Sequence, residues 1–188
     1  ECDRARRKAE TKEDFLASIN VIEQQGNKMN TLIEQLLSLT RIQQGTEKYP
    51  LRVCDLSGFV DACCDEFVPA DERGMTLETD IEPGVAAAYN PSLLSRAMFN
   101  LMQNAYKYGR EGGNIRVSLC RENGCAVISV KDDGPGIPKD QQSAIFERFY
   151  QADGSHKSEG NGLGLALVKR VIDIVGGDIS VSSEVGVG

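Results

Sequence analysis

Features that identify several common protein classes are missing from this chain of 188 residues. No apolar run reaches the roughly 20 residues that a membrane-spanning helix needs, so a transmembrane class is disfavoured. The net charge of -7 argues against nucleic acid as the main partner, because a protein that binds a phosphate backbone needs a positive surface. The six cysteines are irregularly placed and include no Cys-x-x-Cys pair, which favours reduced thiols over a disulfide framework.

Histidine is scarce as well, since His156 is the only one in the sequence. It lies in DGSHKSEGNGLGLALVKRV (153–171), a polar loop that leads into an apolar helix. Either this histidine carries chemistry, or the loop surrounds a phosphate and the reactive group lies elsewhere. The opening ECDRARRKAETKED does not resemble a signal peptide, so we expect any membrane attachment to lie outside these residues.

What the chain does contain is typical of a soluble globular protein, with 40% hydrophobic and 26% charged residues. Its first part predicts a long helix with apolar residues in alternating steps of four and three. This heptad stripe is formed by Phe15, Ile19, Ile22, Gly26, Met29, Ile33, Leu36 and Thr40. Such a face needs a partner, either a helical bundle completed by a second subunit or the domain that follows.

The segment QQGTEKYP (43–50) ends this helix, and beyond it short strands mix with helices. This pattern predicts an α+β two-layer sandwich with one dominant core. We expect strands at 51–56, 75–81, 86–89, 114–121, 125–131 and 178–183, with Asn123-Gly124 as a hairpin turn. We expect helices from a Ser57 cap to about Glu72, at 91–108 after an Asn90 cap, around 141–150, and at 163–175.

The predicted helix at 91–108 carries the first candidate site residues. Asn100 and Asn104 are four positions apart and therefore share one face, where their carbonyl oxygens could hold a Mg²⁺ that already carries phosphate oxygens. Lys107 follows on the same face and could pair with a phosphate. Polar residues at this spacing can equally form a solvated face.

The second candidate is the turn KDDGPGIP (131–138), which follows an apolar strand. Asp132 could accept a hydrogen bond from an exocyclic amine, while Gly134 and Gly136 would let a flat ring approach the backbone. A plain turn uses the same residue types.

The third candidate is a glycine-rich helix start, in which Gly160, Gly162 and Gly164 precede an apolar helix. The unpaired amides at a helix N-terminus and the helix dipole favour an anion there. The stretch lacks the lysine of a Walker loop, and it does not match the dinucleotide-binding fingerprint.

Together, these stretches closely resemble the catalytic ATP-binding domain of sensor histidine kinases, in the superfamily that includes gyrase, the Hsp90 chaperones and the MutL mismatch-repair proteins. FNLMQNAYKYG resembles the N box, DDGPGIP the G1 box, FERFYQAD the F box and GNGLGLALVKRV the G2 box. FLASINVIEQQGNKMNTLIEQLLSLTRIQQG looks like the second helix of the dimerisation and phosphoacceptor hairpin. The resemblance implies a Bergerat-type ATP-binding fold, a mixed sheet with helices on one face, in residues 50–188, and part of that hairpin in residues 1–45.

The resemblance also implies roles for individual residues. Asn104, supported by Asn100, would bind Mg²⁺, and Lys107 would reach phosphate. Tyr108 would pack on the adenine, and Asp132 would accept from its amine. The ATP site would further include Gly134, Gly136 and Ile137 around the base and Gly160, Gly162, Leu163, Gly164 and Leu165 around the phosphates. Phe146 and Phe149 would anchor a mobile lid at about 151–159 that contains His156 and Lys157. Phe146 and Phe149 could instead be core residues, and Tyr108 could be a packing residue at the helix end.

In the family the phosphoacceptor histidine lies in the first hairpin helix, so we expect it outside this sequence, and we expect His156 to be a solvated lid residue. The fragment alone would then not be a competent histidine kinase. We also expect a further family strand beyond Gly188, so that one sheet edge is open or differently covered.

The implied partners are ATP with Mg²⁺, a response-regulator receiver domain, and a second copy bound through the helical bundle, in the cytoplasmic portion of a membrane-bound sensor. Hydrolytic relatives carry a glutamate where this chain has Asn100, so a kinase is favoured over an ATP-hydrolysing clamp. A non-catalytic, nucleotide-gated interaction module remains the other alternative.

Overall fold

The computed structural model describes residues 12–44, 49–67, 73–151 and 161–188. The chain divides into two compact units, Glu1–Gln44 and Gly45–Gly188. The first unit holds helix α2 (Lys12–Gln44), which confirms the long helix predicted from the heptad pattern. Its stripe residues Phe15, Ile19 and Met29 are exposed within this chain, so what covers them stays a prediction. None of the helices in the described ranges is long and apolar enough to cross a membrane.

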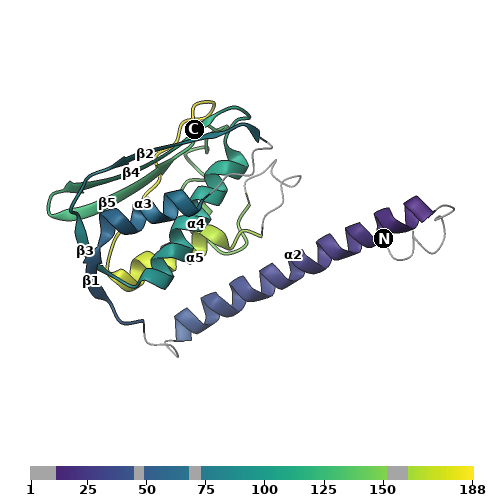
Figure 1. The fold of residues 1–188 in the computed structure, drawn as a ribbon, viewed down its shortest axis with the longest axis horizontal. Helices are drawn as coiled ribbons and strands as arrows, with labels where there is room; N and C mark the ends of the chain where they lie inside the picture. The colour runs from purple at the N-terminus through teal and green to yellow at the C-terminus, as the bar shows by residue number, and fades with distance from the viewer. Residues whose placement is uncertain (1–11, 45–48, 68–72, 152–160) are drawn as a thin grey trace. The chain divides into compact units, whose positions relative to one another are not determined.

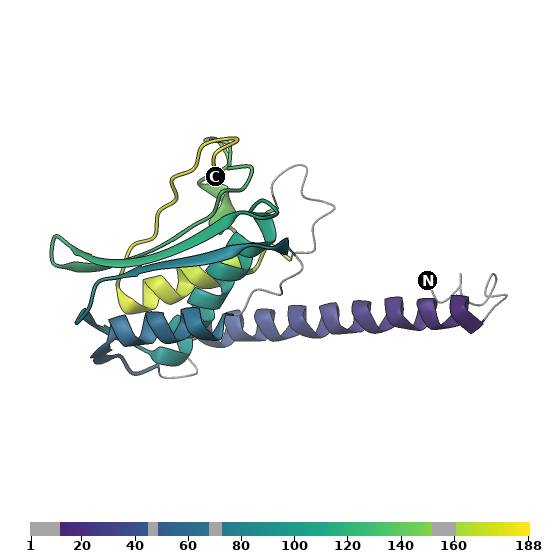
Figure 2. The same ribbon diagram turned by 45° about the horizontal axis from the view of Figure 1, so that its top comes forward.

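The second unit is built on a mixed sheet in the order β2-β4-β5 (Thr76–Ile81, Asn114–Glu122 and Cys125–Lys131). β2 pairs with β4 in parallel, and β4 pairs with β5 antiparallel. A separate antiparallel ribbon joins β1 (Arg52–Asp55) to β3 (Ala86–Tyr89). Helices α3 (Leu56–Glu66), α4 (Pro91–Tyr108) and α5 (Gly164–Val175) cover one face of the three-stranded sheet (Figures 1 and 2). This confirms the predicted two-layer α+β class.

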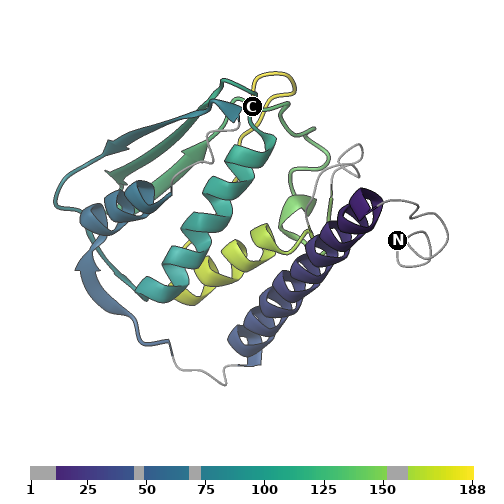
Figure 3. The same cartoon turned by 45° about the vertical axis from the view of Figure 1, so that its right-hand side comes forward.

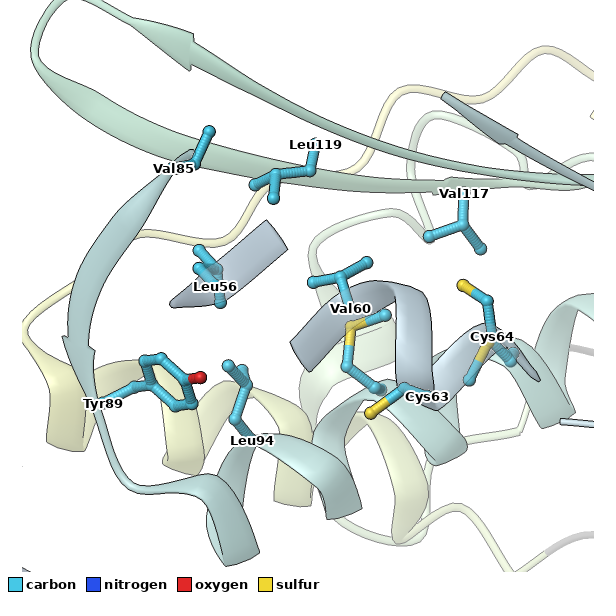
Figure 4. Packing of buried hydrophobic residues seen from close by; sticks show 11 residues of the cluster. Leu56, Val60, Cys63, Cys64, Val85, Tyr89, Leu94, Val117 and Leu119 are labelled. Atoms are coloured by element: carbon cyan, nitrogen blue, oxygen red, sulfur yellow. The ribbon is translucent and has the colours of Figure 1, made fainter. Parts of the chain in front are cut away.

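The hydrophobic core lies between the sheet and the helices. Val117 and Leu119 project from β4 toward Leu56 and Val60 of α3, and Leu94 of α4 closes the layer (Figure 4). Val60 and Val117 are completely buried. Burying a side chain of this size stabilises a fold by roughly 1.5–3 kcal/mol, so this layer fixes where the helices lie on the sheet.

Helix α4 lies between α3 and α5 in the helical layer, as Figure 3 shows. Its ends match the sequence prediction, because the Asn90 side chain accepts from the Leu93 amide and Gly109 follows the last turn. Leu93, Met98 and Met102 lie on its buried face. Asn100 and Asn104, on another face, are half-buried. The fold thus holds the predicted N-box helix in the middle of its layer.

The hairpin prediction is also confirmed. Asn123 and Gly124 adopt positive φ angles of 50° and 82°, and Glu122 pairs with Cys125. Cys120 faces Val127, as the turn geometry predicts. The cysteines of the described residues are free, with Cys63 and Cys64 buried and Cys125 exposed.

Three details of the predicted elements are wrong. Asp55, not Ser57, caps α3 by accepting from the Gly58 amide, and α3 ends at Glu66 rather than near residue 72. The Ser57 hydroxyl instead donates to the Glu82 carbonyl and accepts from the Val85 amide. The predicted helix around 141–150 is only the 3₁₀ turn η2 (Ala144–Phe146).

The predicted strand at 178–183 is not formed within the described ranges. Ser183 and the turn that follows it bond instead to residues 135–137. An alternating pattern indicates extended chain, but a strand also needs an edge with which to pair. Here the hydrogen bonds of Ser183 and the following turn are made with the loop at 135–137, and no β-ladder forms.

Candidate functional site

The polar face of α4 is the surface on which the candidate site is built. Asn100, Asn104 and Tyr108 recur every four residues and therefore lie along one face. The Asn100 amide group donates to the Arg96 carbonyl at 2.7 Å. This bond uses the nitrogen of the side chain and leaves its oxygen, Oδ1, as the atom that can contact a ligand.

The start of α5 packs directly against this face. A Cβ atom placed on Gly164 would lie 2.8 Å from Asn100 Oδ1 and 3.9 Å from Asn104 Nδ2. Gly162 has a φ of +64°, and a Cβ there would lie 2.6 Å from the Tyr150 carbonyl oxygen. Backbone atoms therefore exclude a side chain at Gly162, whereas a methyl group at Gly164 would have to displace the Asn100 side chain. The first turn of α5, with buried Leu163 before it and Leu165 within it, faces the two asparagines.

The turn after β5 packs against the other end of the same helix. The Asp132 carboxylate accepts from the Gly134 amide at 2.9 Å. A Cβ on Gly134 would lie only 2.6 Å from the Tyr108 carbonyl oxygen, so a side chain cannot be accommodated there. The loop that carries Asp132 is thus held at the C-terminal end of α4.

These contacts bring together three stretches that are distant in sequence. Asn100, which is nearest to the start of α5, and Tyr108, which is beside the Asp132 loop, are two helical turns apart, or about 12 Å along the axis. The N-terminal amides of α5 and the acidic turn therefore lie along one face of α4. This convergence confirms that the three predicted segments are neighbours.

Asp133, the neighbour of Asp132, has a structural role that the sequence analysis missed. Its two carboxylate oxygens accept from the backbone amides of Arg110 and Asn114, each at 3.1 Å. Desolvation alone would raise the pKa of Asp133, but these amides and the nearby Arg110 charge lower the pKa below its ordinary value. Asp133 therefore ties the acidic turn to the loop between α4 and β4.

Arg73 was likewise not predicted as part of the site. Its guanidinium donates to the carbonyls of Tyr106, Lys107 and Gly109, at 2.8 Å for Lys107 and 2.6 Å for Gly109. These are the unpaired carbonyls of the last turn of α4, where a cation also complements the helix dipole. Arg73 thus fixes the backbone that carries Lys107 and Tyr108, a contact between distant residues that no local pattern signals.

Lys107 and Tyr108 contact each other at the end of α4. The Lys107 ammonium lies 3.1 Å from the Tyr108 hydroxyl and 4.6 Å from the centroid of its ring. The Tyr108 side chain is 39% exposed, which leaves part of its ring open to a ligand. Tyr108 therefore lies beside the Asp132 loop, and the predicted role of Lys107 at the phosphates stays a prediction.

Of the predicted lid at about 151–159, the structure describes only Gln151, so His156 and Lys157 lie outside the described residues, as does Gly160. Phe149 is 62% exposed with a φ of 63°, and its amide donates to the Gly162 carbonyl at 2.8 Å. The alternative reading of Phe149 as a core residue is therefore wrong. Phe146 is half-buried, with the Lys169 ammonium 5.8 Å from its ring centroid.

Asn100 fits a magnesium ion that arrives with phosphate, because its Oδ1 lies at the start of α5, whereas the Asn104 atom nearest Gly164 is its nitrogen, Nδ2. Amide oxygens are hard ligands of the kind that Mg²⁺ accepts, and the space at Gly164 has no Cβ to fill it. The described residues contain no cluster of three or more His, Cys, Asp or Glu side chains that could hold a metal alone. A metal here would therefore take most of its ligands from phosphate and water.

Comparison with known proteins agrees with this geometry. Residues 89–188 match the family model described as histidine kinase-, DNA gyrase B-, and HSP90-like ATPase. The chain is 37% identical to the sensor histidine kinase RppB of Synechocystis over 174 residues, covering 90% of this chain and 38% of that protein. It is 35% identical to the alginate biosynthesis sensor protein KinB of Pseudomonas aeruginosa, covering 96% of this chain and 30% of that protein.

Solved structures give the same result. Full-length ShkA in complex with AMPPNP superposes with a TM-score of 0.79 at 27% identity, over 94% of this chain and 37% of that chain. The mycobacterial sensor histidine kinase MprB has a TM-score of 0.62 at 31% identity, over 70% of this chain and 85% of that one. This chain spans 38% of the length of RppB and 30% of the length of KinB. It belongs to the sensor histidine kinases, in the family of histidine kinase-, DNA gyrase B-, and HSP90-like ATPases.

Proposed function

We propose that this chain binds Mg-ATP on the polar face of α4, with the base at the Asp132 loop and the phosphates at the start of α5. The observation that carries this proposal is that the start of α5 packs against Asn100 and the Asp132 loop packs against Tyr108, two helical turns apart on one face of α4. The ATP analogue named in the ShkA structure supports the same ligand class.

Each residue then has a definite task. Asp132 accepts a hydrogen bond from the exocyclic amine of the base, and the Tyr108 ring packs on its face. The first amides of α5 and the Lys107 ammonium bind phosphate oxygens. Asn104 and Asn100 would hold Mg²⁺, which when bound neutralises phosphate charge and orients the γ-phosphoryl group.

We further propose that the γ-phosphoryl group is transferred to a histidine other than His156 and then to a response-regulator aspartate. Hydrolysis is disfavoured because Asn100 occupies the place of the glutamate that activates water in hydrolytic relatives, and an amide cannot act as a general base. Positioning and electrostatics would supply most of the catalysis. In the intact cytoplasmic kinase, residues 1–45 would belong to the dimerisation hairpin and residues 50–188 to the catalytic domain.

A transfer assay with labelled ATP tests this function. The chain is mixed with a protein that carries the hairpin and its acceptor histidine, with and without Mg²⁺. We expect acid-labile phosphohistidine on the acceptor only when Mg²⁺ is present, together with little free phosphate. ATP binding without phosphohistidine would favour the nucleotide-gated module, and steady phosphate release would favour the hydrolytic clamp.

A further inference from the structure

The Asp132 loop has a second support, in addition to α4. This support is the C-terminal turn, defined here as residues 183–188. The Gly186 amide donates to the Pro135 carbonyl at 2.7 Å. Gly136 has a φ of +73°, and a Cβ there would overlap the Glu184 carbonyl, so the two backbones are in direct contact. The loop is therefore held between an α-helix and a turn that is about 50 residues away in sequence.

Two side chains join the loop to the C-terminal turn. The Ser183 hydroxyl accepts from the Ile137 amide at 2.8 Å and donates to the Gly188 carbonyl at 3.1 Å. The Gln142 amide group donates to the carbonyls of Ile137 and Ser183, each at 2.9 Å. Ser183 and Gln142 together satisfy both backbone polar groups of Ile137, so removal of either leaves a half-buried group without its partner.

We propose that Ser183 and Gln142 are positioning residues for the base-binding loop. They hold Ile137 and Gly136 against the C-terminal turn and thereby keep the Asp132 carboxylate at the end of α4. Neither side chain contacts the nucleotide in this account. The inference rests on the proposed function, because it assumes that Asp132 accepts a hydrogen bond from the base.

The test compares Ser183→Ala and Gln142→Leu in the full chain by calorimetric titration with ATP and with adenosine, which has no phosphates. Each substitution removes two hydrogen bonds, one of them to the Ile137 backbone, and should weaken both ligands by the same factor, about five- to tenfold. Ser183→Thr keeps the hydroxyl and should restore the affinity. The matched control Ser182→Ala removes an exposed neighbouring hydroxyl and should have no effect. The melting temperature without nucleotide is measured for every variant.

The two ligands separate the inference from a general loss of structure. Gly164→Ala, on the phosphate side, should weaken ATP but not adenosine. Unchanged affinities in Ser183→Ala and Gln142→Leu would overturn the proposal, as would a loss for ATP with none for adenosine. If Ser183→Ala fails to fold, the ATP and adenosine affinities of Gln142→Leu are used for the same comparison. If the unaltered chain binds neither ligand, the proposed function itself fails, which is a distinct result.

Discussion

At the scale of single residues, the Asp132 carboxylate is the group to which we assign recognition of the base. In Asp132→Asn the side chain keeps its size and its oxygen can still accept from the Gly134 amide, but the negative charge is lost. Hydrogen bonds to charged groups contribute roughly 1.5–3 kcal/mol, so we expect ATP affinity to fall about ten- to a hundredfold. Calorimetric titration measures this, with the exposed Asp140→Asn as control. Equal affinities in all three proteins would remove Asp132 from the base site.

Gly164 is the residue at which α5 comes nearest to the asparagines. In Gly164→Ala the new methyl group would lie 2.8 Å from Asn100 Oδ1 and must displace that side chain. Because alanine is a better helix former than glycine, by up to about 1 kcal/mol, we expect unfolding stability to be nearly unchanged. ATP affinity should fall about tenfold in the presence of Mg²⁺. Gly177→Ala, with 3.4 Å to its nearest neighbour, is the matched control; a similar loss there would contradict a specific role for Gly164.

The Asp133 carboxylate makes the stability of the fold depend on pH. Folding lowers the pKa of the Asp133 carboxyl below its ordinary value of 3.8. The stabilisation by its charge is therefore complete at pH values above 3.8, and it is lost as the pH falls through the lower pKa of the folded state. Asp133→Asn should therefore be less stable than the unaltered chain at pH 7, and this difference should shrink as the pH falls below about 4. Urea unfolding at several pH values measures this. A difference that stays constant down to pH 3 would show that the charge of Asp133 is not responsible.

At the scale of elements, the end of α4 depends on Arg73. Arg73→Met keeps much of the side-chain volume but removes the guanidinium that donates to the Tyr106, Lys107 and Gly109 carbonyls. We expect a loss of about 1–3 kcal/mol in the free energy of unfolding and weaker ATP binding, because the last turn carries Lys107 and Tyr108. Chemical denaturation and titration test both, with exposed Arg52→Met as control. An unchanged unfolding free energy would mean that water caps this helix equally well.

The elements also show how far local sequence determines this fold. The hairpin and both ends of α4 were predicted, because Asn123-Gly124, Asn90 and Gly109 act through neighbours a few residues away. The hydroxyl of Ser57 favours a capping role in the sequence, yet in the structure it bonds to Glu82 and Val85 across the fold. Residues 178–183 have a strand pattern, but the hydrogen bonds of the segment that follows go to the loop at 135–137.

The residues of the candidate site also fall into two groups, those that the sequence predicts and those that only the folded structure reveals. Asn100, Asn104, Asp132 and the glycines were predicted because their types and order match known motifs. Arg73, Asp133, Gln142 and Ser183 were missed because each acts on backbone groups that are near only in the folded chain. Groups that we propose to contact the ligand are thus predictable from motifs, whereas groups that support the backbone are found only in the folded structure.

At the scale of the whole molecule, the account depends on residues from α4, the Asp132 loop and the start of α5 forming one nucleotide site. The most direct measurement is an amide NMR titration of the full chain with Mg²⁺ and a non-hydrolysable ATP analogue. The account predicts that the signals of Asn104, Gly134 and Gly164 shift together, with one affinity and one ligand per chain. Signals that titrate with different affinities, or shifts confined to one of the three segments, would contradict it.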